Sequence, residues 1–238
     1  MHSLTSDVAW TLVVVSWLAL VALGLAARVG PRDDLMTALA WRLCRVYCRI
    51  VHRLEVEGAE HVPSAIHPGP LIVVANHTAG IDPLAIQASC PFFIRWLMAQ
   101  RMMLPRYQWV WEWAGIIPVS GSGRELSSAR NAMRALEGGD VIGIFPEGGI
   151  ERPACTLLPF IAGVGLIIAK TKAPVLPVIV RGAPDTPTAW GSLFRFSRTR
   201  VTFKERICYA KSGLRAEEIA KDLERRYSEW TGWAVAAG

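Results

Sequence analysis

The sequence predicts an α/β fold in which helices cover both faces of a mixed sheet, with a membrane helix and an amphipathic helix at the N-terminus. Short β-branched apolar runs alternate with segments of helical periodicity, which is typical of α/β sheets. Hydrophobic residues make up 52% of the 238 positions and charged residues only 19%, a composition that indicates contact with a membrane. We expect an N-terminal anchor over residues 1–53 and an α/β domain over residues 54–238.

The first apolar run covers residues 8–27 and contains no charged side chain. At about 1.5 Å per residue, a helix of this length spans the roughly 30 Å of bilayer hydrocarbon. A cleaved signal peptide is disfavoured because Met1–Asp7 carries no Lys or Arg, whereas an interfacial insertion that does not cross the bilayer stays open. Arg28 and Arg32 follow the run, so the positive-inside rule predicts a single-pass or monotopic protein with its α/β domain on the cytoplasmic side.

The next segment, from Asp33 to about Arg53, has the periodicity of an amphipathic helix. An apolar face and a stripe of arginines recur at helical spacing, formed by Leu35, Leu39, Leu43, Val46 and Ile50 and by Arg42, Arg45, Arg49 and Arg53. The helix either lies among lipid headgroups with its arginines on phosphates, or packs on the core and exposes its charged face. The neighbouring apolar run favours the membrane.

A candidate catalytic pair follows the first buried strand of the α/β domain. Residues 71–75 form a β-branched apolar run behind a Pro/Gly breaker, which predicts a strand that ends just before His77. Asp82-Pro83 predicts a helix start, because Asp is a good N-cap and Pro suits the first helical position. A carboxylate that meets a histidine across so short a loop can orient the imidazole and stabilise its protonated form. His77 and Asp82 are therefore the predicted general base and its partner.

The remaining elements follow from the same patterns, in which Gly, Pro and Asp separate the apolar runs. The expected strands cover residues 54–58, 92–99, 116–119, 141–145, 175–180 and 200–209. The expected helices cover residues 83–90, the stretch after Arg124 to about 136, and residues 161–170 and 214–230.

Charge and cysteine content narrow the class of partner. The net charge is +6, but no Lys/Arg run is interleaved with aromatic residues, so anionic lipid or an anionic substrate fits better than nucleic acid. The five cysteines form no Cys-x2-Cys pair, which disfavours a zinc site or a disulfide framework. Cys44, Cys48 and His52 recur at helical spacing, and we assign them to packing rather than to a metal.

A second motif supplies the resemblance to a known family. Phe145-Pro146-Glu147-Gly148 ends another predicted strand, where open α/β sheets place their ligands. Together with Asn76-His77-x4-Asp82, this motif resembles the glycerolipid acyltransferases of the lysophosphatidic acid acyltransferase type. The resemblance implies an enzyme without a metal or other cofactor, in which His77 deprotonates an acceptor hydroxyl. That hydroxyl then attacks an acyl thioester, either acyl-CoA or acyl carrier protein.

The same resemblance implies a set of substrate-binding residues. Its first motif contributes Asn76, the third Glu147, Gly148 and Gly149, and the fourth, an apolar strand with a proline, Pro177. The family places a phosphate-binding arginine in the second and third motifs. Here the nearest candidates, Arg124 and Arg152, are displaced from those places.

The displaced arginines leave the acceptor open, because Arg binds phosphate through geometry-dependent bidentate contacts. The leading acceptor is 1-acylglycerol-3-phosphate, which would give phosphatidic acid. Another lysolipid or an amino-acid-based lipid is the alternative within the enzyme class. A membrane lipid-binding protein without catalytic activity is the alternative in a different class.

Overall fold

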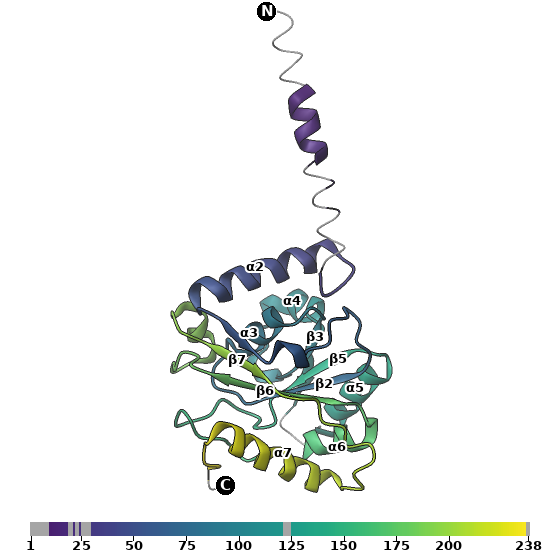
Figure 1. The fold of residues 1–238 in the computed structure, drawn as a ribbon, viewed down its shortest axis with the longest axis vertical. Helices are drawn as coiled ribbons and strands as arrows, with labels where there is room; N and C mark the ends of the chain where they lie inside the picture. The colour runs from purple at the N-terminus through teal and green to yellow at the C-terminus, as the bar shows by residue number, and fades with distance from the viewer. Residues whose placement is uncertain (1–9, 19–20, 22–23, 25–29, 121–124, 237–238) are drawn as a thin grey trace, which may run out of the picture.

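The computed structural model describes residues 10–18, 21, 24, 30–120 and 125–236. A seven-stranded sheet with the order β1-β7-β6-β2-β5-β3-β4 forms its centre (Figure 1). Paired strands run parallel except for β6 and β7, so the predicted mixed sheet is confirmed. The strands are β1 (Glu55–Glu57), β2 (Leu71–Ala75), β3 (Ile94–Ala99), β4 (Ile117–Val119), β5 (Val141–Ile144), β6 (Val175–Arg181) and β7 (Arg200–Phe203).

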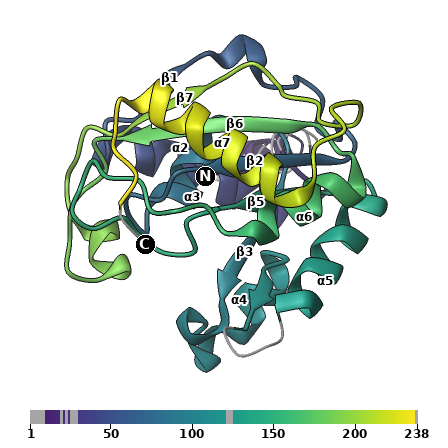
Figure 2. The same ribbon diagram turned by 90° about the horizontal axis from the view of Figure 1, so that it is seen from below.

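Helices cover both faces of this sheet. On one face lie α2 (Leu35–Val51) and α3 (Asp82–Ser89), and on the other lie α5 (Glu125–Glu137), α6 (Ala162–Thr171) and α7 (Ala216–Thr231) (Figure 1). The short α4 (Gln108–Trp113) follows β3. Figure 2 shows α7 crossing the sheet over β6 and β2. The predicted alternation of strands and helices is thus confirmed, except that β7 ends at Phe203 rather than near residue 209.

The central strand β2 contacts both halves of the core. Ile72 and Val74 pack in the cluster formed with α5, α6 and α7, whereas Leu71 and Val73 pack in the cluster that contains α3. Every residue of β2 is buried, which explains why its sequence is a continuous apolar run rather than an alternating one. The loop that follows β2 is therefore anchored on a rigid strand.

The helix α2 packs on the core but exposes its large apolar side chains, and its position among lipid headgroups stays a prediction. Asp34 caps it by accepting a hydrogen bond from the backbone N–H of Thr37 at 2.7 Å. Its small residues Thr37, Ala38 and Cys48 are buried, and the indole N–H of Trp41 donates to the backbone of α3. The large apolar side chains point away from the core and are exposed: Met36, Leu39, Leu43, Val46 and Ile50. We call these five residues the α2 apolar face.

The predicted membrane span over residues 8–27 lies partly outside the described residues. Within it, residues 10–18 are helical. In the part of the chain that the structure describes, no helix is both long enough and apolar enough to cross a bilayer.

Candidate active site

Two strand ends meet to form the candidate site. β2 and β5 are parallel neighbours, so the loops that follow them leave the same edge of the sheet. The loop after β2 carries His77, and the turn after β5 carries Glu147. The structure brings these residues together, since the backbone N–H of His77 donates to Glu147 Oε1 at 2.8 Å.

His77 and Asp82 are in contact, as the sequence predicts. His77 Nδ1 lies 3.0 Å from Asp82 Oδ2, and the His77 side chain retains 18% of its exposure while Asp82 is fully buried. The carboxylate also accepts hydrogen bonds from the backbone N–H groups of Thr78 (2.6 Å) and Ala79 (2.8 Å). Asp82, the predicted N-cap, is instead the first residue of α3, and Ile81 occupies the cap position. The Asp82 side chain turns back onto the loop.

This geometry selects one tautomer of the imidazole. An ionised carboxylate accepts hydrogen bonds but cannot donate them, so His77 Nδ1 carries the hydrogen. The lone pair then remains on Nε2, which can accept a proton from a bound hydroxyl. The arrangement has the chemical capacity of a general base.

A stack of three rings fixes the plane of the imidazole. The His77 and Phe145 rings lie 4.0 Å apart between centroids at 18°, and the Phe145 and Trp96 rings lie 4.8 Å apart at 13°. Gly143 makes room for this stack, because a Cβ at that position would lie 2.4 Å from the Trp96 ring. The stack joins β3, β5 and the loop after β2.

The turn after β5 holds the His77 backbone from both sides. Besides the bond from His77 N–H to Glu147, the Glu151 N–H donates to the His77 carbonyl at 2.8 Å. The second oxygen of Glu147 accepts from Leu158 N–H at 2.8 Å, so both its oxygens bind backbone groups. Gly148 permits the turn because its φ is +68°, in the left-handed region. The structure thus gives Glu147 a positioning role, whereas its predicted contact with substrate stays a prediction.

Burial makes both carboxyl groups of this turn weak acids. The pKa of Glu147 is raised to about 8, mainly by burial, although its two backbone hydrogen bonds act in the opposite direction. The pKa of Glu151 is raised to about 7, again mainly by burial. Glu151 is 2% exposed, and its Oε2 has no hydrogen-bond partner among the described residues. Perturbed carboxyl groups of this kind concentrate at functional sites.

Asn76 and Pro177, both predicted to bind substrate, lie inside the sheet. Asn76 is fully buried, and its amide both donates to the Val180 carbonyl (3.0 Å) and accepts from the Val180 N–H (2.8 Å). Pro177 lies opposite Val74 in the pairing of β2 and β6, and its carbonyl accepts from the Lys204 N–H at 2.9 Å on the side of β7. The structure assigns both residues to joining β2 and β6.

Of the two predicted phosphate-binding arginines, the structure describes only Arg152, which is already engaged by oxygen atoms of the protein. Arg152 donates to the backbone carbonyls of Glu151 (2.6 Å) and Thr186 (2.8 Å) and lies 3.4 Å from a carboxylate oxygen of Asp185. Arg124 lies outside the described residues. Gly149 is in the turn after β5, where it separates Gly148 from the segment leading to Glu151. Phosphate binding by either arginine stays a prediction.

Sequence reasoning missed the ring stack and the part played by Tyr227. The Tyr227 hydroxyl donates to the Val74 carbonyl at 2.6 Å and accepts from the Val178 N–H at 3.1 Å. The hydroxyl therefore bridges the Val74 carbonyl of β2 and the Val178 N–H of β6. No local pattern in the sequence relates residue 227 to β2 or β6, so this contact could not be predicted.

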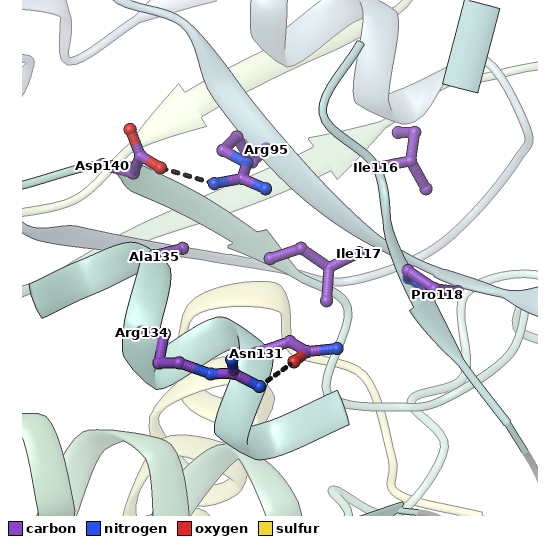
Figure 3. A pocket seen from close by; sticks show the side chains of 8 residues that line it. All are labelled: Arg95, Ile116, Ile117, Pro118, Asn131, Arg134, Ala135 and Asp140. Carbon is purple, nitrogen blue, oxygen red and sulfur yellow. Dashed lines mark hydrogen bonds and ion pairs between the residues drawn. The ribbon is translucent and has the colours of Figure 1, made fainter. Parts of the chain in front are cut away.

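A separate cavity of about 340 Å³ opens at the other edge of the sheet, near the starts of β3, β4 and β5 (Figure 3). The charged groups there are already paired: Arg95 lies 2.6 Å from Asp140, and Arg134 donates to Asn131 at 2.7 Å. The candidate active site lies at the opposite strand ends, so this cavity does not belong to it.

Sequence and structure comparisons match this chain to known acyltransferases. A profile of the Acyltransferase family matches residues 53–181, which include His77, Asp82 and Glu147. The chain is 24% identical over 178 residues to the chloroplastic 1-acyl-sn-glycerol-3-phosphate acyltransferase BAT2 of Brassica napus, covering 72% of this chain and 50% of that protein. It is 31% identical over 132 residues to the 1-acyl-sn-glycerol-3-phosphate acyltransferase of Borreliella burgdorferi, covering 53% and 50%.

The chain thus spans about half the length of these curated relatives. A solved structure shares the fold: the 1-acyl-sn-glycerophosphate acyltransferase PlsC from Thermotoga maritima matches with a TM-score of 0.67 and 21% identity, over 84% of this chain and 83% of that one. Because the family profile covers more than half of the sequence, the chain belongs to the acyltransferase family.

Proposed function

We propose that this protein transfers a fatty acyl group from an acyl thioester to the hydroxyl of a lysophospholipid, with 1-acylglycerol-3-phosphate as acceptor and phosphatidic acid as product. The observation that carries the proposal is the contact of His77 Nδ1 with the buried Asp82 carboxylate, which leaves Nε2 available as a base. Membership of the acyltransferase family and the names of the two curated relatives support the reaction class and this acceptor.

The chemistry follows from this pair. His77 Nε2 removes the proton of the acceptor hydroxyl as its oxygen attacks the thioester carbonyl carbon, and Asp82 stabilises the imidazolium that forms. Backbone N–H groups are suitable donors to the negative charge that develops on the carbonyl oxygen. The C–S bond then breaks, and the thiolate takes the proton from His77 and leaves as a thiol. Because the thioester is already activated, these steps use only side chains and the backbone.

The acyl donor is acyl-CoA or acyl carrier protein in this proposal. Both are acidic, and the net charge of +6 favours either one. The contacts of Arg152 favour a second candidate acceptor, an uncharged lysolipid or an amino-acid-based lipid, because its guanidinium is already bound to Thr186 and Glu151. A lipid-binding role without catalysis would leave the oriented His77 unexplained.

We place the reaction at a membrane surface, on its cytoplasmic side. The α2 apolar face is exposed and is flanked by the exposed Arg45 and Arg49. A helix with this distribution lies in the headgroup layer, with its apolar side chains toward the acyl chains and its arginines on lipid phosphates.

The test is acyl transfer by the detergent-purified full chain, supplied with mixed acyl-CoA and either lysophosphatidic acid or uncharged and zwitterionic lysolipids. We expect His77→Ala to lower kcat by about 10³-fold, since general bases contribute on that order. His67→Ala is the matched control, because that imidazole is exposed and pairs only with Asp33 among the described residues. Full activity of His77→Ala would exclude the proposed base. A preference for an uncharged lysolipid would exclude phosphatidic acid as the product and keep the reaction class.

A further inference from the structure

The two most exposed phenylalanines of the described chain lie close together in sequence. Phe194 is 85% exposed and Phe196 is 77% exposed, at the end of the 3-10 helix η4 (Ala189–Phe194) and just beyond it. The exposed Arg195 lies between them, and the exposed Arg198 follows. Soluble surfaces rarely leave neighbouring aromatic rings this open to water without a function for them.

This segment is fixed against the C-terminal end of α2. The Tyr47 hydroxyl donates to the Leu193 carbonyl, and Ser197 N–H donates to the Val51 carbonyl at 3.2 Å. Ser197 Oγ also lies 2.8 Å from His52 Nδ1. The segment that carries the two phenylalanines therefore lies beside the C-terminal end of α2 (Figure 1).

The other end of the segment packs against the candidate active site. A Cβ at Gly80 would lie only 2.2 Å from the Ala189 carbonyl oxygen, so the loop between His77 and Asp82 rests directly on η4. The Thr186 carbonyl accepts a hydrogen bond from Arg152, which follows the turn after β5. Residues 186–198 thus connect the site to the exposed apolar surface.

We propose that Phe194 and Phe196 form a second membrane-docking element, which enters the interfacial layer of an anionic bilayer beside α2. The proposal rests on the proposed function and deepens it, because it brings the loop of His77 to the lipid surface that presents the acceptor. Charge complementarity favours a lipid surface as the occupant, since Arg195 and Arg198 add to the arginines of α2 and each can contact lipid phosphate. An aromatic ring flanked by arginine suits the boundary between headgroups and acyl chains.

The first experiment measures binding of the full chain to vesicles of phosphatidylcholine with or without phosphatidylglycerol. We expect the double substitution Phe194→Ser and Phe196→Ser to weaken partition into anionic vesicles by at least about tenfold. This figure follows from the apolar area that two rings would remove from water when half inserted into the bilayer. Backbone hydrogen exchange at residues 190–199 should slow when vesicles are added to the unmodified chain, and this slowing should be lost in the variant. Leu214→Ser is the control, because Leu214 is exposed just before α7, on the opposite face of the sheet.

Vesicle binding would not change in the double variant if the N-terminal segment alone held the chain on the membrane. Hydrogen exchange still tests the proposal in that case, because it reports on residues 190–199 directly. Exchange at 190–199 that is the same with and without vesicles would overturn the proposal. Concentration-dependent self-association that the two substitutions abolish would also overturn it, because the occupant would then be a second copy of the chain.

An activity arm separates this proposal from the proposed function. With acceptor presented in vesicles, we expect the double variant to lose about tenfold in rate, whereas a short-chain acceptor dissolved as monomers should be acylated at the unmodified rate. Equal loss on both acceptors would contradict docking as the role of these rings. If the unmodified chain acylates neither acceptor, the proposed function fails, and vesicle binding with hydrogen exchange still decides the docking proposal.

Discussion

At the scale of single residues, His77 is fixed by contacts to the edge of its ring, to the face of its ring and to its backbone. Asp82 binds Nδ1, Phe145 covers one face of the ring, and Glu147 and Glu151 bind the N–H and the carbonyl of the same residue. A positive charge over the face of an aromatic ring is stabilised by the ring quadrupole. Phe145 is therefore placed to favour the imidazolium that the proposed mechanism requires.

This arrangement predicts a kinetic effect of Phe145. We expect Phe145→Leu to lower kcat about three- to tenfold, because the loss of a cation–π contact of about 0.5–1.5 kcal/mol falls on the charged state of His77. The KM values for both substrates should change by less than about twofold, since the ring lies against His77 and Trp96. Steady-state kinetics on vesicles and in detergent measure both parameters.

Phe145→Tyr is the matched control and should keep most of the rate, since it retains an aromatic face. An unchanged kcat in Phe145→Leu would show that the ring only fills space. A rise in KM without a fall in kcat would instead place Phe145 in substrate binding.

The sequence predicts the contact between His77 and Asp82 well because both residues belong to one short loop after one strand. It also places Glu147 at the correct strand end. The structure adds a positioning role for Glu147 that the sequence could not predict, because its oxygens bind the backbone of His77 and Leu158, and these contacts join segments that are distant in sequence. The stack with Trp96 depends on β3 lying next to β5, which no local pattern specifies.

At the scale of elements, α2 shows what periodicity can and cannot decide. The spacing of its apolar residues correctly predicts a helix with a distinct apolar face. Which face is buried depends on the partner, and α2 contacts α3 through Trp41, Cys44 and Cys48 rather than through its large aliphatic residues. A face that is apolar in sequence can therefore be the outer face, which is the arrangement that a membrane surface requires.

The contact of α7 with the sheet gives a prediction of stability. Tyr227→Phe removes the hydroxyl that bridges Val74 and Val178, and it leaves a buried carbonyl and a buried N–H without partners. We expect the free energy of unfolding to fall by about 1–3 kcal/mol, the usual cost of such groups. Urea denaturation should show a lower midpoint with an unchanged m-value.

Tyr107→Phe is the control and should change the free energy of unfolding by less than about 0.5 kcal/mol, because Tyr107 is exposed. A midpoint for Tyr227→Phe equal to that of the unmodified chain would mean that water or a shifted strand satisfies the two backbone groups. The bridging role assigned to Tyr227 would then be wrong.

At the scale of the whole molecule, the order of strands is the part that sequence could not supply. The apolar runs predict the strands one by one, but the order β1-β7-β6-β2-β5-β3-β4 arises from pairings between distant segments. That order makes β2 and β5 neighbours and so brings His77 to Glu147 and Glu151. The fold thereby buries two carboxyl groups beside its site, and their cost is borne by the stability of the entire domain.

The buried Glu151 makes that stability depend on pH. Its pKa is raised from the ordinary 4.5 to about 7, so the folded chain holds this proton more tightly than the unfolded chain does. The resulting stabilisation is complete below about pH 4.5 and is lost as the pH rises through about 7. We expect the free energy of unfolding to fall between pH 5 and 8, with a contribution from Glu151 on the order of 2–3 kcal/mol.

Glu151→Gln should remove this contribution, because an amide does not ionise and its oxygen can still accept the Cys155 N–H bond. Urea denaturation at pH 5 and at pH 8 measures the difference. A smaller fall should persist in the variant, since the pKa of Glu147 is raised to about 8 by burial and acts in the same direction. The exposed Glu205→Gln should leave the full pH dependence intact. If Glu151→Gln keeps the whole fall as well, the Glu151 carboxylate is stabilised in the folded chain by a group other than Cys155, and burial does not control its proton.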